Sequence, residues 1–332
     1  MDITPLEARR SFNCYSGCVT ALLERKGLIY SEPVALGLSG GLNLEFTREG
    51  PVHYRGIREL HCITEFLEQR GLRVRREVEA DSNAFEELVV RNLAADLPVM
   101  VEYDGYYFPF THIYLRIHER RIGLIVGADD KAYRITDRVY GVEQVEIPRE
   151  LLFEARSPSL GAAVEPAWYD VSMPKSDRSV GPEVLNAVLS TSEHMLGVSH
   201  DGGLQGICGV EQFASQTKQR FQDWHDPVQL AELAEELKQG AILFDHYGEF
   251  LQRAPSWTSM CSARACSEAG AEALRIASRL RLISALSLKC AISDVNRCSD
   301  RMVVALVEIA ERASVMFGLL KREVSASISE VV

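Results

Sequence analysis

The 332-residue sequence has no C-x-x-C pair and no apolar run long enough to cross a bilayer. Its eight cysteines lack the paired or histidine-associated spacing of zinc sites and of disulfide frameworks, so we expect reduced thiols and no metal. No stretch approaches the roughly eighteen apolar residues that span a membrane. The segment Met1 to Phe12 is short and charged, unlike a signal peptide. These absences predict a cytoplasmic protein without a membrane partner.

An excess of positive charge is also missing, since the net charge is −11. A nucleic-acid-binding protein carries a basic surface, so a nucleic-acid partner is not expected. What is present is ordinary for a globular protein, with 46% hydrophobic and 25% charged residues. A chain of this length can bury a full core and is expected to contain two domains.

A cysteine stands at the start of the first predicted helix. Asn13 and Cys14 lead into an apolar-periodic segment that runs from Val19 to Gly27, which places Cys14 in the first helical turn. Backbone N–H groups there are unpaired and the helix dipole is positive, so a thiol at this position tends to ionise and become a nucleophile. The alternative is a small buried core cysteine. Because no glutamine precedes Cys14, its own backbone N–H is the expected oxyanion donor, with Asn13 as a further candidate.

The order of elements predicts an α+β half followed by an all-α half. Up to about residue 155, helices are predicted at 57–69 and 83–93 and strands at 72–75, 99–103, 121–126 and 132–136. The proline-containing segment 158–182 reads as a linker or arm. Beyond it the periodicity is helical, at 213–224, 227–238, 241–253, 262–288 and 295–323. We therefore predict domains at 1–160 and 183–332, joined by a linker at 161–182.

Two strings of motifs resemble a known family. The first runs from Cys14 and its helix through Gly27 and Ser31-Glu32 to Gly37-Leu38-x-Gly40-Gly41-Leu42, and the second includes Gly206-x-x-Gly209, Trp224 and Phe244-Asp245-x-Tyr247-x-x-Phe250-Leu251. Together they resemble the N-terminal and helical C-terminal domains of the butirosin-biosynthesis acyltransferase family. The resemblance implies a papain-like N-terminal domain adapted to make amides. Gly40 and Gly41 would then let the backbone pass close to a substrate beside the thiol.

The same family pattern supplies the expected partners of the thiol. Asp104, which matches the family's substrate-contact aspartate, is followed by an aromatic-rich step that contains Tyr107, and Tyr114, His118, Gly127, Asp129 and Asp137 fit in register. The second histidine of the family's His-x-x-His pair is replaced by Arg121. An arginine stays protonated and cannot act as a base at neutral pH.

Three alternatives follow for the base that a papain-type thiol requires. His118 could act from one turn earlier, His112 could do so if residues 113–117 and 122–126 form a hairpin, or the histidine could have been lost. We favour His118 as the base and Asp137 as the residue that orients it. Tyr107, His112 and Arg121 are further candidates for substrate contact.

The function that this resemblance implies is acyl transfer from a thioester to an amine through an acyl-enzyme on Cys14. The expected partners are an acyl carrier protein with a phosphopantetheine thioester, a small-molecule amine and, as one option, a second copy of the chain. No cofactor is expected. Two alternatives remain: a cysteine hydrolase that acts as a peptidase or amidase, and a non-catalytic carrier- or metabolite-binding protein on a degenerate papain-like fold.

Overall fold

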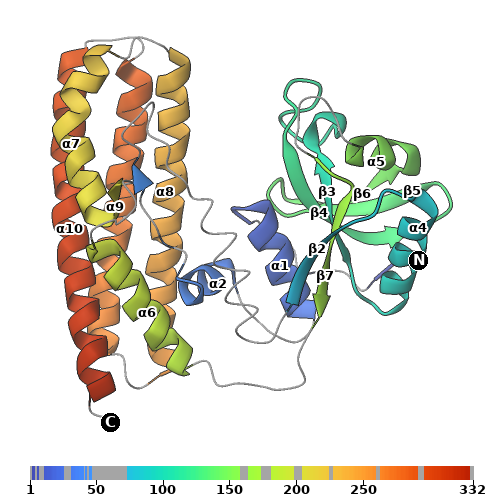
Figure 1. The fold of residues 1–332 in the computed structure, drawn as a ribbon, viewed down its shortest axis with the longest axis horizontal. Helices are drawn as coiled ribbons and strands as arrows, with labels where there is room; N and C mark the ends of the chain where they lie inside the picture. Colours follow the sequence, from blue (N-terminus) through green and yellow to red (C-terminus); the bar gives the residue numbers. More distant parts are fainter. Residues whose placement is uncertain are drawn as a thin grey trace. The chain divides into compact units, whose positions relative to one another are not determined.

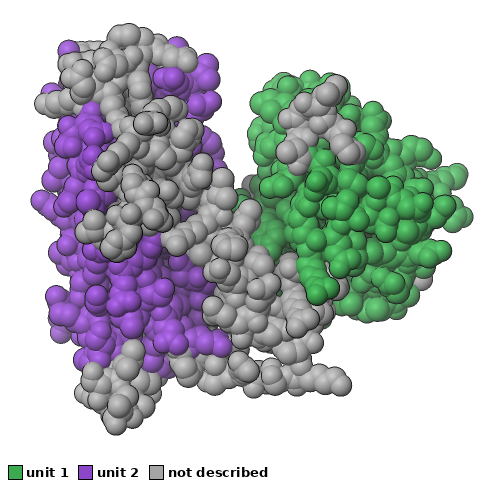
Figure 2. Space-filling view, in the orientation of Figure 1, with its two compact units in different colours: residues 1–32, 64–176 green, residues 33–63, 177–332 purple. Residues whose placement is uncertain are grey.

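A computed structural model of the chain describes residues 2–3, 6, 11–25, 31–40, 42, 45–46, 73–157, 164–172, 181–197, 204–223, 227–258, 262–290 and 295–329. The chain divides into two compact units (Figure 2), one formed by Met1–Glu32 with Thr64–Ser176 and the other by Pro33–Ile63 with Asp177–Val332. The first unit combines helices with an antiparallel sheet and the second is helical, so the α+β class with a helical C-terminal part is confirmed.

The first unit is built on a six-stranded antiparallel sheet with the strand order β2-β7-β3-β4-β5-β6 (Figure 1). Its strands are β2 (Arg73–Val78), β3 (Val99–Asp104), β4 (Arg120–Ala128), β5 (Ala132–Asp137), β6 (Val142–Pro148) and β7 (Ala167–Ser172). The predicted strands at 99–103, 121–126 and 132–136 lie within β3, β4 and β5. Residues 161–182 read as a linker from the sequence, but β7 lies among them and pairs with both β2 and β3.

In the described part of this unit, three helices and one short turn of 3-10 helix accompany the sheet. They are α1 (Cys14–Arg25), α4 (Ser82–Ala94), η1 (Gly105–Tyr107) and α5 (Arg149–Arg156). Asp81 caps α4 by accepting the Ala84 N–H at 2.8 Å. The helix predicted at 57–69 lies outside the described residues. α1 packs on β4, where the Cys18 Sγ lies 3.7 Å from the Ile122 carbonyl oxygen.

The second unit is a bundle of long helices with one short two-stranded sheet. Its elements are α2 (Glu32–Leu38), β1 (Glu45–Phe46), α6 (Gly181–Leu196), β8 (Leu204–Gln205), α7 (Gly206–Asp223), α8 (Pro227–Arg253), η2 (Ala254–Ser256), α9 (Ala263–Cys290) and α10 (Val295–Ser329). The helices predicted at 227–238 and 241–253 form one continuous helix, α8. The sequence pattern missed α6 and the pairing of β1 with β8. Among the described helices, none combines the length and the apolar character needed to cross a membrane.

Candidate active site

Cys14 is the first residue of α1, as its sequence position predicts. The Asn13 side chain caps the helix, because its Oδ1 accepts the backbone N–H of Tyr15 at 2.8 Å and that of Ser16 at 3.4 Å. Cys14 is partly exposed as a residue, although its sulfur is largely shielded from water, whereas Cys18, one turn further along, is almost fully buried. Of these two cysteines, only Cys14 can therefore meet a substrate.

Glu32 holds the backbone just before Cys14 and the Ser16 side chain just after it. Its carboxylate accepts the Phe12 N–H at 2.9 Å and the Asn13 N–H at 3.0 Å, and it also accepts the hydroxyl of Ser16. Glu32 is itself buried. The sequence pointed to Ser31-Glu32 only as part of a motif, and the structural role of the carboxylate was not predicted.

The charged groups that act on the Cys14 thiol are Arg121 and Asp137. Burial raises the pKa of Cys14, the charge of Arg121 lowers it, and Asp137 raises it. The net shift is upward, so the position at the helix N-terminus does not by itself ionise the thiol, contrary to our expectation. Loss of water around the sulfur outweighs the effect of the neighbouring cation.

Arg121 and Asp137 come from two neighbouring strands. Tyr103 donates its hydroxyl to the Asp137 Oδ2 at 2.6 Å, and the Arg121 Nη2 lies 3.8 Å from the same oxygen. The other oxygen, Oδ1, accepts the N–H groups of Val139 and Tyr140 at 2.9 and 3.2 Å. Asp137 is completely buried, so these four groups fix it in place.

The Arg121 side chain is one-tenth exposed, and its guanidinium lies over the Tyr140 ring at 4.8 Å from the ring centre. Its Nη1 lies 3.4 Å from Glu119 Oε1. Its Nε and Nη2 are buried and have no hydrogen-bond partner in the part of the chain that the structure describes. Burial lowers the pKa of Arg121, but the negative charges of Cys14 and Asp137 raise it by a larger amount. The net shift of the pKa is upward, so the guanidinium stays charged.

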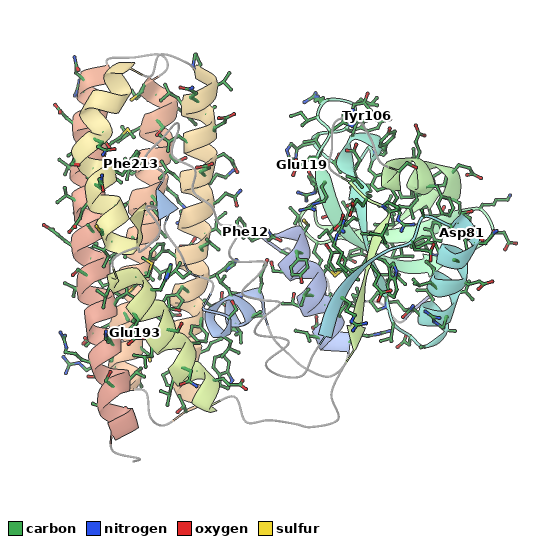
Figure 3. The ribbon with its side chains drawn as sticks, viewed as in Figure 1. Phe12, Asp81, Tyr106, Glu119, Glu193 and Phe213 are labelled. Atoms are coloured by element: carbon green, nitrogen blue, oxygen red, sulfur yellow. The ribbon has the colours of Figure 1, made fainter. Side chains whose placement is uncertain are left out.

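His118, the predicted base, is paired with Asp104. Its Nδ1 lies 2.6 Å from the Asp104 Oδ2, and its ring stacks on Tyr106 with 4.1 Å between the ring centres. Tyr106 and Glu119, which adjoin this histidine, are labelled in the upper part of the first unit in Figure 3. Neighbouring residues of a strand point to opposite sides, so Asp104 points away from the side of β3 to which Tyr103 points. The structure therefore joins His118 to Asp104 and Asp137 to Tyr103.

His112 is exposed, and its Nδ1 lies 3.0 Å from the hydroxyl of Tyr140. Residues 113–116 form turns and residues 113–117 form no strand, so the hairpin that would have brought His112 to the start of β4 does not form. Neither His112 nor His118 forms a hydrogen bond with Cys14. The residue that the strand start places beside the thiol is Arg121.

Tyr107 and Gly40 are the other predicted residues that the structure describes. The Tyr107 ring lies edge-on to the Tyr106 ring, with 5.3 Å between the ring centres, and it is also next to the His118 ring. Gly40 has φ +67° just after α2, a conformation that favours glycine, and it belongs to the second compact unit. Gly41 lies outside the described residues. In the described part of the chain, no cluster of three or more histidine, cysteine, aspartate or glutamate side chains is suited to a metal.

Chemically, the site offers a thiol at a helix start, a fixed cation with unused N–H donors and a carboxylate that holds the cation. Such an arrangement can stabilise negative charge beside the sulfur.

The comparison with family models agrees with the first string of motifs, whereas the second string, from Gly206 to Leu251, lies outside the matched residues. Residues 13–138 match the family model described as Butirosin biosynthesis protein H, N-terminal. This stretch includes Cys14, Arg121 and Asp137. The comparison with curated proteins gave no match.

Proposed function

We propose that the chain, whose residues 13–138 match the family model described as Butirosin biosynthesis protein H, N-terminal, is a cysteine-dependent acyltransferase that forms amide bonds in specialised-metabolite biosynthesis. The first unit would be a papain-like domain. The donor would be an acyl group on the phosphopantetheine thiol of a carrier protein, and the acceptor a small-molecule amine.

The observation that carries this proposal is the arrangement of Cys14, Arg121 and Asp137 on α1, β4 and β5. Papain-type sites place a nucleophile at a helix start and two supporting side chains on neighbouring strands. Here the supporting pair is Arg121 and Asp137, so the strand position that usually holds the base carries a cation.

The reaction takes place in two steps at the thiol. The Cys14 sulfur attacks the thioester carbon, a new S–C bond forms, and the carrier thiol leaves with a proton. The amine nitrogen then attacks the acyl carbon, the C–N bond forms, the bond to the Cys14 sulfur breaks, and the amine gives up its proton. Thioester exchange is nearly isoenergetic and aminolysis runs downhill, so a positioned thiol is the main requirement.

Of the three alternatives for the base, the geometry favours loss of the histidine from the position beside Cys14. His118 is held by Asp104, and His112 is held by Tyr140. A hydrolase must activate water at the acyl carbon, which an arginine cannot do. The same feature keeps a second candidate open, namely a non-catalytic protein that binds an acylated carrier.

Intact-protein mass spectrometry tests the proposal. The full chain is incubated with an acylated carrier protein, and the mass of the chain is recorded with and without an amine. We expect an acyl adduct that the amine discharges as an amide, no adduct on Cys14→Ala, and an adduct on Cys18→Ala, whose thiol is buried. Free acid without amide would indicate a hydrolase, and absence of any adduct would indicate a binding protein. Equal loading of the Cys14→Ala variant would refute the acyl-enzyme.

A further inference from the structure

Arg121 is a buried cation with unused hydrogen-bond donors beside the candidate nucleophile. The residue is only 9% exposed, and its Nε and Nη2 lack acceptors in the described part of the chain. Glu119 lies near Nη1 only, and the Asp137 Oδ2 lies 3.8 Å from Nη2, which is too far for a hydrogen bond. That oxygen already accepts the hydroxyl of Tyr103. Asp137 and the Tyr140 ring thus hold the guanidinium in place without using these two N–H groups.

Leaving such donors unpaired is costly. A buried donor without a partner costs about 1–3 kcal/mol, and a charged one costs more. Native structures satisfy nearly all buried polar groups, so these two donors beside Cys14 are available to an acceptor that arrives from outside. An acceptor delivered with the substrate would remove this cost.

We propose that Arg121 donates its Nε–H and Nη2–H groups to the acyl oxygen of the thioester on Cys14, and that the site consequently passes the acyl group to an amine in preference to water. This inference rests on the proposed acyl-enzyme. The acyl oxygen is attached to the carbon that bonds to the sulfur, so it arrives next to Arg121 whenever Cys14 is acylated. Negative charge develops on this oxygen as each tetrahedral intermediate forms, and fixed donors aimed at it contribute strongly to rate.

The preference for an amine over water follows from the presence of an arginine, in place of a histidine, at position 121. Water attacks an acyl group effectively only when a base takes its proton, and a guanidinium cannot take one. A neutral amine is a sufficient nucleophile without such help. Its nitrogen forms the C–N bond, the C–S electron pair returns to the Cys14 sulfur, and the ammonium proton passes to that sulfur or to solvent. The acyl-enzyme should therefore persist until an amine arrives.

Two reactions of the same thiol separate the role of Arg121 from a general effect on Cys14. Iodoacetamide alkylates the sulfur without producing an oxyanion, whereas S-acetylpantetheine acylates it through one. Both rates can be measured on the full chain by intact mass. We expect Arg121→Gln to lower acylation about 10²-fold more than alkylation, the usual effect of losing an oxyanion donor. Arg121→Lys, which keeps the charge but not the two-pronged donor, should fall between wild type and Arg121→Gln.

Arg120→Gln is the matched control, because Arg120 precedes Arg121 on β4 and is exposed. It should leave both rates unchanged. Equal losses of acylation and alkylation in Arg121→Gln would overturn the inference, since Arg121 would then act on the thiol alone. Failure of wild-type Cys14 to acylate, although it alkylates, would instead refute the acyltransferase proposal and this inference with it.

Arg121→His tests the selection against water. An imidazole next to Asp137 can activate water, so we expect its acetyl-enzyme to hydrolyse at least about 10-fold faster than the wild-type acetyl-enzyme. The ratio of amide to free acid at a fixed amine concentration should fall in parallel. If the wild-type adduct hydrolyses as fast as that of Arg121→His, the arginine does not protect the acyl group.

Discussion

Replacing Glu32 tests whether the backbone around Cys14 depends on one buried carboxylate. This side chain accepts two backbone N–H groups, from Phe12 and Asn13 at 2.9 and 3.0 Å, and the Ser16 hydroxyl. Hydrogen bonds to charged groups are each worth about 1.5–3 kcal/mol when buried. Phe12 and Asn13 are only partly buried, so water can replace part of what is lost. We therefore expect Glu32→Ala to lower the free energy of unfolding of the first unit by about 2–4 kcal/mol.

Glu32→Gln should cost roughly half as much, because the amide keeps one acceptor oxygen but turns an N–H₂ group toward a donor. Hydrogen exchange of peptides from residues 12–23, measured at increasing urea concentration, reports on the stability of this region separately from that of the helical unit. Glu87→Ala, an exposed position on α4, is the control and should change stability by less than about 0.5 kcal/mol.

The reasoning fails if Glu32→Ala loses less than about 1 kcal/mol, the lower limit for a single unmet buried donor. It also fails if acylation of Cys14 is unaffected while residues 12–16 exchange freely. That result would mean that the position of the thiol does not depend on the carboxylate.

Three further predictions concern the histidines, a motif glycine and pH. His118→Ala and His112→Ala should each leave acylation of Cys14 within about tenfold of wild type, and a loss near 10²-fold in one of them would identify that residue as the base. Gly37→Ala should destabilise the second unit by about 1–3 kcal/mol in thermal unfolding, because the added methyl group would overlap the ring of Phe250; an unchanged melting temperature would contradict this packing. Because burial raises the pKa of Cys14, the rate of its alkylation by iodoacetamide should still increase above pH ~9. For the same reason, the protonated thiol should contribute to the free energy of unfolding, and this contribution should be lost as pH rises through the folded-state pKa. A rate already constant at pH 7 would show a thiolate instead.

Local patterns were enough to predict the elements that carry the candidate site. A helix start at Cys14, a strand that begins near Arg121 and a second strand that ends at Asp137 follow from periodicity and caps, and the structure has all three. The resemblance of residues 13–138 to the butirosin family is confirmed as well.

Contacts between residues distant in the chain could not be read in the same way. Glu32 accepts a hydrogen bond from a residue 20 positions earlier, and nothing in its immediate neighbourhood signals this. His118 fits the family register, yet its partner is Asp104 because the register of β3 with β4 brings them together. Prolines made the segment around β7 look like a linker, whereas pairing with two other strands makes it part of the sheet.

The position of β7 also determines when the first unit can finish folding during synthesis. Its residues, 167–172, follow the other five strands in the chain but insert between β2 and β3 in the sheet. Until they leave the ribosome, β2 has no partner in the sheet and β3 is an unprotected edge, which is an aggregation hazard. Closing this pairing spans nearly a hundred residues, from Arg73 to Ser172, so it is expected to be a slow step. The unit that contains Cys14 must therefore stay incomplete in the nascent chain until the segment that leads into the helical unit has been made.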